Sequence, residues 1–356
     1  MAAPRFTAPT NDFFSELKAR INDHFEQKGT SPTGNSKLFT KAIILVLGFV
    51  GLYVHLVFFT PPAWLAVLEC ILLGSAGASI GFNIMHDGAH GSFSESKWLN
   101  NIAGLSLNVL GGNVFMWNTK HNVIHHTYTN IDDVDDDLDA RPFLRLCQSQ
   151  KKYKLHKYQH YYFWAIYAFL YIYWIGYSDF HKYFTGKVGD FKIAKMKRSE
   201  HISFWAFKVL FAAFFIALPI FMVGFLPWLI GFLVFTMSTG LVMSIVFQLA
   251  HTVSETHFPL PEAKTNKMEE AWAIHQLKTT ANFATNNKMV SWFSGGLNFQ
   301  IEHHLFPKIS HVHYPEISKI IKKACQDYGV EYIEFPRLRT AIYSHIMHLR
   351  QLALAN

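Results

Sequence analysis

The sequence predicts an all-α integral membrane protein, with four transmembrane helices in two hairpins and a helical cap on the cytoplasmic side. Half of its 356 residues are hydrophobic and only 16% are charged, against about a quarter in soluble domains. Four apolar runs, at about 38–59, 63–85, 204–223 and 228–250, come in two pairs, and no basic residue lies in either intervening turn. The net charge of +7 therefore indicates contact with a membrane surface rather than with nucleic acid.

The first 37 residues form a polar, cytoplasmic N-terminal segment. We expect no cleavable signal peptide, because no basic stretch leads into an apolar one. Residues 11–27 would form a short amphipathic helix, and residues 28–35 are typical of a loop. The apolar side of that helix carries Phe13, Phe14, Leu17, Ile21 and Phe25.

The first two apolar runs are each long enough to cross a bilayer core, which takes about 20 residues. Pro61 and Pro62 end the first run, and the second leads directly into His86. We expect these runs to form a tight transmembrane hairpin. Residues 98–117 are less apolar and rich in Asn and Gly, so we expect them to lie in the interface or re-enter rather than span.

The middle region is both basic and aromatic. Residues 141–201 contain twelve Lys or Arg, and residues 158–180 contain nine Tyr and Trp. The second hairpin follows, with its turn at 224–227. Residues 38–325 would form one membrane-embedded domain, and residues 326–356 a cytoplasmic C-terminal tail.

The basic residues predict the orientation. Apart from Lys41 and Lys208 near the ends of runs, every Lys and Arg lies outside the hairpins. The positive-inside rule then places both turns outside, and both termini and the polar regions in the cytoplasm. If the polar regions before and after residues 158–180 share one site, this segment cannot cross the membrane once, because a single crossing would put the two regions on opposite sides. Their Tyr and Trp content favours an interfacial helix, and a fifth span is the alternative.

Seven of the 20 histidines stand in three short clusters beside the apolar runs. In an α-helix, residues four apart face the same way, so the two histidines of the first cluster project together. The first two histidines of the second cluster also project together, while its third histidine points in another direction. Imidazole is a common metal ligand, and seven exceed the four of a tetrahedral zinc, so we expect two neighbouring metals. The clusters are His86 and His90; His121, His125 and His126; and His303 and His304, preceded by Gln300.

Other histidines and the cysteines are weaker signals. His251 ends the fourth run at the depth of His86 and would complete a set of eight, although a histidine at a helix end often only compensates the dipole. His257, His311 and His313 are expected at the surface or behind the ligands. Three widely spaced cysteines give no disulfide framework and no zinc-finger spacing.

The three clusters resemble the histidine boxes of the membrane fatty acid desaturase superfamily, over roughly residues 38–325. Residues 295–307, GGLNFQIEHHLFP, resemble the third box of front-end desaturases, in which Gln replaces the first His. Many front-end members carry a fused cytochrome-b5-like domain, and we expect none in this chain. Its second box also has three residues between His121 and His125, where several relatives have two.

The resemblance implies a pair of iron ions that uses O2 and two electrons to introduce a cis double bond into a fatty acyl chain. Gln300 would ligate a metal directly or hold a water on it. Carried over by position, one iron would be held by His86, His121, His126 and His303, and the other by His90, His125, His251 and His304. The residues expected to support these ligands are Asp87, Asp136, Asp137, Asp139, Asn298 and Glu302, and Trp292 would line the active site.

The implied substrate is an acyl-CoA or an acyl-lipid in a tunnel between the spans and the cap, and a separate ferredoxin or cytochrome-b5-like protein would supply electrons. Basic residues at 151–157 and 192–198 would meet a phosphate, the carrier or simply the membrane surface. Two other functions stay open: a hydroxylase or ketolase on the same scaffold, and a membrane receptor or transporter with a structural metal. The QIEHH form favours desaturation, and the scarcity of charges in the spans disfavours a transporter.

Overall fold

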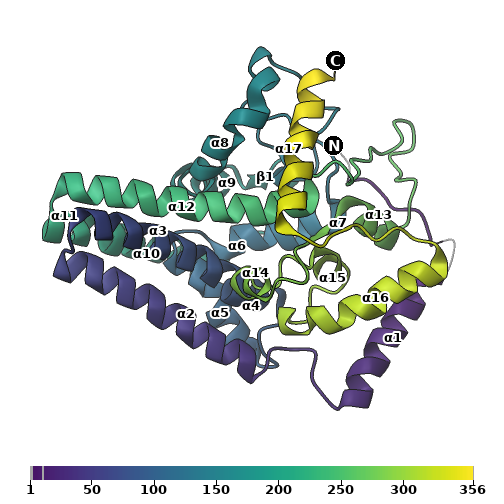
Figure 1. The fold of residues 1–356 in the computed structure, drawn as a ribbon, viewed down its shortest axis with the longest axis horizontal. Coiled ribbons are helices and arrows are strands. Elements are labelled where there is room, and N and C mark those ends of the chain that lie inside the picture. The colour runs from purple at the N-terminus through teal and green to yellow at the C-terminus, as the bar shows by residue number, and fades with distance from the viewer. Residues whose placement is uncertain (1–2, 10–11, 356) are drawn as a thin grey trace.

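The computed structural model describes residues 3–9 and 12–355. Four long helical rods extend together from one side of the molecule, and shorter elements form a cap at their other end (Figure 1). Among the described residues, four helices are long and apolar enough to cross a membrane. They are Ser36–Phe59, Ala63–His90, Arg198–Val223 and Phe225–His251, which confirms the two predicted hairpins.

Three of the four spans are built from successive helical segments that include a π-helical one. The first span joins α2 (Ser36–Val54) to η1 (His55–Phe59), and the second joins α3 (Ala63–Ile80), η2 (Gly81–Met85) and α4 (His86–His90). The third joins α10 (Arg198–Ala212), η7 (Ala213–Ala217) and α11 (Leu218–Val223), and the fourth is α12 (Phe225–His251). The hairpin turns fall where Pro62 precedes α3 and where Gly224 has a φ of +86°, a conformation that glycine adopts without steric cost.

The outer faces of the spans are apolar and exposed. Ile43 is 60% exposed, Leu47 66% and Phe221 85%, and such side chains follow one another along the helices, whereas soluble proteins rarely expose large continuous apolar faces. A lipid bilayer covers such faces, because it removes apolar area from water while every backbone group keeps its helical partner. The chain is therefore an integral membrane protein.

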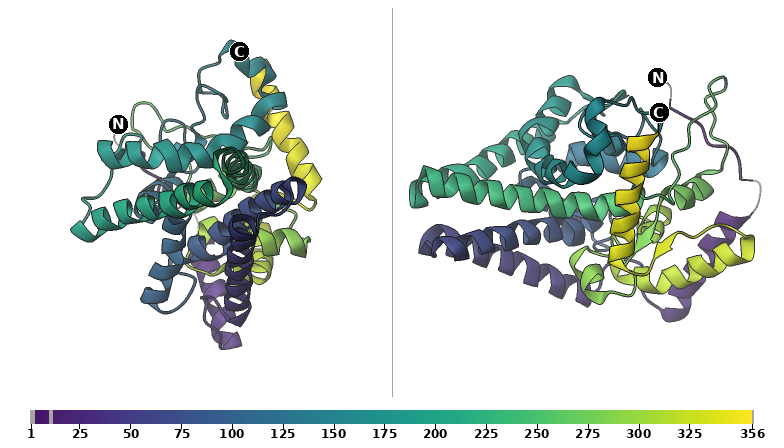
Figure 2. Two further views of the ribbon diagram at one scale, coloured as in Figure 1. Left: turned by 90° about the vertical axis from the view of Figure 1, so that its left-hand side faces the viewer. Right: turned by 45° about the horizontal axis from the view of Figure 1, so that its top comes forward.

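The segment between the hairpins lies across the rods. It starts with α5 (Lys97–Val109), α6 (Val114–Trp117), η3 (Asn118–His125), α7 (His126–Tyr128), η4 (Asp136–Leu138) and η5 (Lys154–Tyr158). Next come α8 (Gln159–Tyr173), η6 (Trp174–Ser178), α9 (Asp179–Thr185) and the antiparallel pair β1 (Lys187–Val188) and β2 (Phe191–Lys192). In both views α8 crosses α12 rather than extending beside the rods (Figures 1 and 2). The aromatic segment is thus not a fifth span.

The rest of the cap follows α12. Its elements are α13 (Trp272–Thr279), β3 (Asn282–Phe283), α14 (Lys288–Phe293), α15 (Gln300–Leu305), η8 (His311–His313), α16 (Tyr314–Tyr328), β4 (Glu334–Phe335) and α17 (Leu338–Leu354). β3 pairs with β4 in parallel, and α17 packs against α8 and α12. Residues 338–354, which the sequence suggested as part of a tail, therefore lie on the helices that surround the site.

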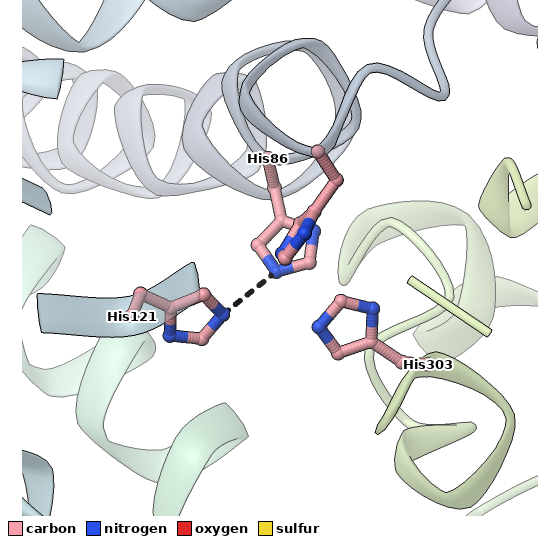
Figure 3. A group of neighbouring side chains, drawn as sticks. His86, His121 and His303 are labelled. Atoms are coloured by element: carbon pink, nitrogen blue, oxygen red, sulfur yellow. Dashed lines mark hydrogen bonds between the residues drawn. The ribbon is translucent and has the colours of Figure 1, made fainter. Parts of the chain in front are cut away.

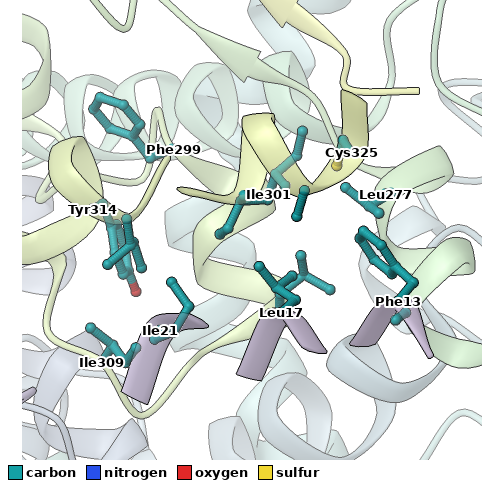
Figure 4. Packing of buried hydrophobic residues seen from close by; sticks show 14 of the residues in the cluster. Phe13, Leu17, Ile21, Leu277, Phe299, Ile301, Ile309, Tyr314 and Cys325 are labelled. Atoms are coloured by element: carbon teal, nitrogen blue, oxygen red, sulfur yellow. The ribbon is translucent and has the colours of Figure 1, made fainter. Parts of the chain in front are cut away.

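The N-terminal helix α1 (Phe13–Lys28) packs against α16 through its apolar side. Phe13, Leu17, Ile21 and Phe25 are buried, as the amphipathic pattern predicted, and Phe14 is partly buried. Residue 11, where the predicted helix began, lies outside the described residues. Figure 4 shows Phe13, Leu17 and Ile21 of α1 facing Ile301 of α15. The same apolar cluster thus supports the segment that carries the third histidine cluster.

Candidate metal centre

The three histidine clusters and His251 meet where the rods enter the cap. Three of the side chains, His86, His121 and His303, come from three different segments and point toward one another (Figure 3). The Nε2 atoms of His86 and His121 lie 3.3 Å apart. Two groups of histidines have ligand atoms within 4.8 Å of one another: His86, His90, His121 and His303; and His125, His251 and His304.

The second cluster lies on a π-helix, and this changes the direction of its side chains. In η3 the backbone N–H of His126 bonds to the carbonyl of His121, five residues earlier, whereas an α-helix bonds residues four apart. His126 consequently faces His121, with Nε2 atoms 3.3 Å apart. The expectation that His126 points away from a shared His121–His125 face was wrong, because it assumed α-helical geometry. His125 stays stacked on His121, with ring centroids 5.1 Å apart, and also contacts His251 and His304.

His90 also differs from the expected partition. Its ring centroid lies 4.7 Å from that of His86 and 4.9 Å from that of His303, so it belongs to the first group and not with His125. His126 lies between the groups, with ring centroids 4.6 Å from His303 and 4.4 Å from His304. His251, the eighth candidate, lies 4.8 Å from His125 and 4.9 Å from His304 by ring centroids.

Four of these imidazoles are oriented through Nδ1 and leave Nε2 for another partner. Nδ1 of His125 lies 2.9 Å from an oxygen of Asp135, and Nδ1 of His304 lies 2.8 Å from Oε1 of Gln276. The other two Nδ1 contacts are His251 with the carbonyl of Thr279 and His303 with the hydroxyl of Tyr314. Their Nε2 atoms, and that of His90, are buried without a hydrogen-bond partner in the described chain.

A cluster of buried lone pairs is unfavourable unless something binds them. A metal ion binds imidazole nitrogens while the opposite nitrogen donates to an oxygen, which is the arrangement found here. The residues therefore fit a metal centre, and their number fits two ions better than one.

Comparison with known proteins identifies the scaffold. Residues 62–336 match the family described as fatty acid desaturase. This chain belongs to that family. It is 34% identical over 341 residues to an sn-1 linoleoyl-lipid 6-desaturase of Synechocystis, covering 96% of this chain and 95% of the relative. It is 33% identical over 353 residues to an acyl-lipid (8-3)-desaturase of Physcomitrium patens, covering 98% of this chain and 73% of the relative. The chain is thus a fatty acid desaturase, an oxidoreductase of acyl chains, as its histidine boxes predicted.

Burial keeps most of the cap histidines of this desaturase neutral. It lowers the pKa of His121 to about 4, and it holds the pKa values of His126, His303 and His304 well below the usual range. His125 is the exception: burial lowers its pKa, but Asp135 and Asp137 outweigh that effect and raise it overall. A neutral imidazole keeps the lone pair that a metal requires.

Of the acidic residues expected to support the ligands, one lies beside them. A carboxylate oxygen of Asp137 is 3.7 Å from Nδ1 of His121 and 3.8 Å from Nδ1 of His125. Asp136 pairs with Lys182, and Asp139 pairs with Arg141. Asp87 accepts from Ser310 and His311 rather than from a cluster histidine.

The remaining candidates have other surroundings. Glu302 accepts from Asn282 and Tyr332, and burial raises its pKa to about 7. Asn298 bonds within the 284–298 loop. Neither Asn298 nor Trp292 lines the cavity beside the histidines, whereas Gln300 does, and its Oε1 has no hydrogen-bond partner in the described chain.

Three residues that orient the candidate ligands could not be predicted from the sequence: Gln276, Thr279 and Tyr314. Gln276 and Thr279 lie on α13 and Tyr314 opens α16, in stretches with no histidine box nearby. Asp135 lay in the acidic stretch but was not singled out. Asp135 also accepts from the backbone N–H of Asn130, five residues earlier. This local contact distinguishes it from the other aspartates of the stretch.

A cavity of about 760 Å³ leads away from the centre. His86, His121 and Gln300 line one part of it, and apolar side chains of α8 and α12, such as Leu170 and Phe247, line its walls. Arg141, Lys182 and Lys187 also border it. The cavity lies between the fourth span and the cap, where the sequence predicted a tunnel for an apolar chain.

Proposed function

We propose that the eight histidines hold two iron ions and that the desaturase introduces a cis double bond into an acyl chain carried by a membrane lipid. The observation that carries this proposal is the set of buried, partnerless imidazole nitrogens grouped with His86 and His121, which line an apolar cavity. Imidazole suits iron, and eight such side chains exceed what one zinc uses. When bound, the iron pair would supply oxidising power from O2 and two electrons.

The residues of the chain have three tasks in this proposal. Asp135, Gln276 and Tyr314 hold imidazole rings in place, so that the ligand geometry does not depend on the metal alone. Gln300 lines the cavity and keeps a buried amide oxygen without a partner in the described chain, which would ligate a metal or hold a water. The apolar walls of the cavity position one methylene of the chain and exclude bulk water.

The charges around the cavity favour a lipid substrate over acyl-CoA. Lys120 pairs with Asp137 at 2.7 Å, Lys182 with Asp136 at 3.2 Å, and Arg141 with Asp133 and Asp139 at 2.9 and 2.8 Å. Three of the four Lys and Arg side chains at the cavity, all but Lys187, are thus already neutralised by carboxylates, while the phosphates of coenzyme A need several free cations. The names of the relatives, which specify lipid-linked acyl chains, support the same choice.

We further propose that the bond forms on the carboxyl side of the chain, as the QIEHH box suggests, and that the centre and both termini face the cytoplasm. Residues 38–325 would be the catalytic domain. Electrons would come from a separate ferredoxin or cytochrome-b5-like protein.

Expression in a host of known lipid composition tests the function. New double bonds located by mass spectrometry in intact lipids, with about two irons per chain, are the expected result. His304→Ala should abolish the product while the protein stays in the membrane. A hydroxylated product, one zinc per chain, or desaturation by His304→Ala would contradict the proposal.

A further inference from the structure

The C-terminal helix α17 places a buried histidine between the cavity wall and the metal-binding end of α12. The buried face of α17 includes Ala341, Ser344, His345 and His348. His345 is only 2% exposed and lies outside the three histidine clusters. None of the proposed tasks of the centre uses it.

The two ring nitrogens of His345 contact two different helices. Nδ1 lies 2.6 Å from the carbonyl oxygen of Thr252, and Nε2 lies 2.9 Å from the hydroxyl of Tyr167. A carbonyl only accepts, so Nδ1 carries the proton and donates. Nε2 is then the acceptor, and the Tyr167 hydroxyl donates to it. Burial lowers the pKa of His345 to about 4, which keeps this neutral form.

Both partners belong to the surroundings of the substrate cavity. Tyr167 lines the cavity on α8. Thr252 directly follows His251, and its hydroxyl donates to the side chain of Gln248 at 2.6 Å. Gln248 lines the cavity from α12. His345 thus connects the α8 wall to the α12 wall beside a proposed iron ligand.

The backbone of α8 is held against α12 at Tyr167 and Ala168. Ser244 donates to the carbonyl of Tyr167 at 3.2 Å, and a Cβ at Gly240 would meet the carbonyl of Ala168 at 2.4 Å. The helix crossing is therefore fixed at Gly240 and Ser244. The direction of the Tyr167 ring within the cavity then depends on its hydroxyl, and so on His345.

We propose that His345 is a positioning residue for the acyl chain. By holding Tyr167 against the end of α12, it sets the shape of the cavity beside the metal centre. The shape of the cavity in turn determines which methylene of the chain lies next to that centre. This inference rests on the proposed desaturation. It assigns to the C-terminal helix a role in selecting the bond and the chain length, and not in binding metal.

The test compares four variants in a host that supplies acyl chains of several lengths. His345→Leu removes both contacts, and Tyr167→Phe removes a single oxygen atom. Each should change the ratio of products, by bond position or chain length, by about threefold or more, the scale of one neutral hydrogen bond. The iron content per chain should stay at the wild-type level. His345→Gln keeps a donor and an acceptor, so its product ratio should lie closer to that of the wild type.

His348→Leu is the matched control. His348 lies one turn further along α17, is buried, and bonds through Nε2 to the carbonyl of Leu146 at 2.8 Å, but it does not line the cavity beside the centre. Its variant should keep the wild-type product ratio.

Three results would overturn the inference: wild-type product ratios in Tyr167→Phe, a loss of iron that accounts for the His345→Leu phenotype, or an equal shift in His348→Leu. If His345→Leu does not accumulate, Tyr167→Phe decides the question alone. A wild-type protein that forms no double bonds would instead refute the proposed function.

Discussion

At the scale of single residues, the centre depends on the oxygen atoms behind the histidines. Asp135 is 3% exposed and accepts from both Nδ1 of His125 and the backbone of Asn130. Asp135→Asn keeps the shape but removes the charge that orients and supports the imidazole. We expect iron content or desaturation to fall by about 10- to 100-fold, measured as iron per purified chain and as product in lipids.

Asp133→Asn is the control for that change. Asp133 belongs to the same acidic stretch, but its side chain is 55% exposed and pairs with Arg141. Surface ion pairs contribute little, so iron content and activity should stay near wild type. Equal losses in both variants would mean that the total charge of the stretch matters, and not the contact with His125.

At the scale of secondary-structure elements, the crossing of α8 over α12 requires a glycine. A Cβ at Gly240 would lie 2.4 Å from a carbonyl oxygen of α8, so Gly240→Ala forces the helices apart. We expect a loss of about 1–3 kcal/mol in the free energy of unfolding, as for other overpacked sites. Thermal unfolding in detergent measures it.

Gly48→Ala provides the comparison, since Gly48 also lies in a span but nothing is within 4 Å of its Cβ position. That variant should be neutral or slightly stabilising, because alanine favours the helix. A similar loss in both variants would show that helix flexibility, and not the close crossing, is what Gly240 provides.

The same scale shows what could be predicted from the sequence. The spans and the buried side of α1 follow from local hydrophobic patterns, and the three histidine clusters are visible as residue types at fixed spacings. The π-helical register of η3 is not visible in this way, because a π-helical turn holds one extra residue of the chain and no residue type or spacing marks where that happens. Gln276, Tyr314 and His345 reach their partners across the fold, so no spacing along the chain indicates them.

At the scale of the whole molecule, metal binding and folding should be linked. The proposed ligands come from α4, η3, α7, α12 and α15, so metal ions would join distant parts of the chain. Chelation should lower the melting temperature by about 5–10 °C, and added ferrous iron should restore it. An unchanged melting curve after complete removal of metal would contradict this linkage.

The orientation in the membrane is a second whole-molecule prediction. All three cysteines are buried, so introduced cysteines can be labelled against a low background. Leu226→Cys lies in the exposed first turn of α12, directly after the hairpin turn at Gly224, and Lys154→Cys lies in the cap. A membrane-impermeant thiol reagent applied to intact cells should label residue 226 and not residue 154. The opposite pattern would invert the topology.

The π-helix of η3 bears on how histidine boxes of different length can be compared. Here the first and last histidines of the second box, His121 and His126, are five residues apart and meet because the helix bonds residues five apart. In a box with one residue fewer, the corresponding histidines are four apart, and an ordinary α-helix brings them together. The two spacings are then equivalent solutions of one geometry, in which an inserted residue is absorbed as a helical bulge. When boxes of the two lengths are aligned, a gap inside the box therefore matches histidines that have the same role, although their spacing along the sequence differs.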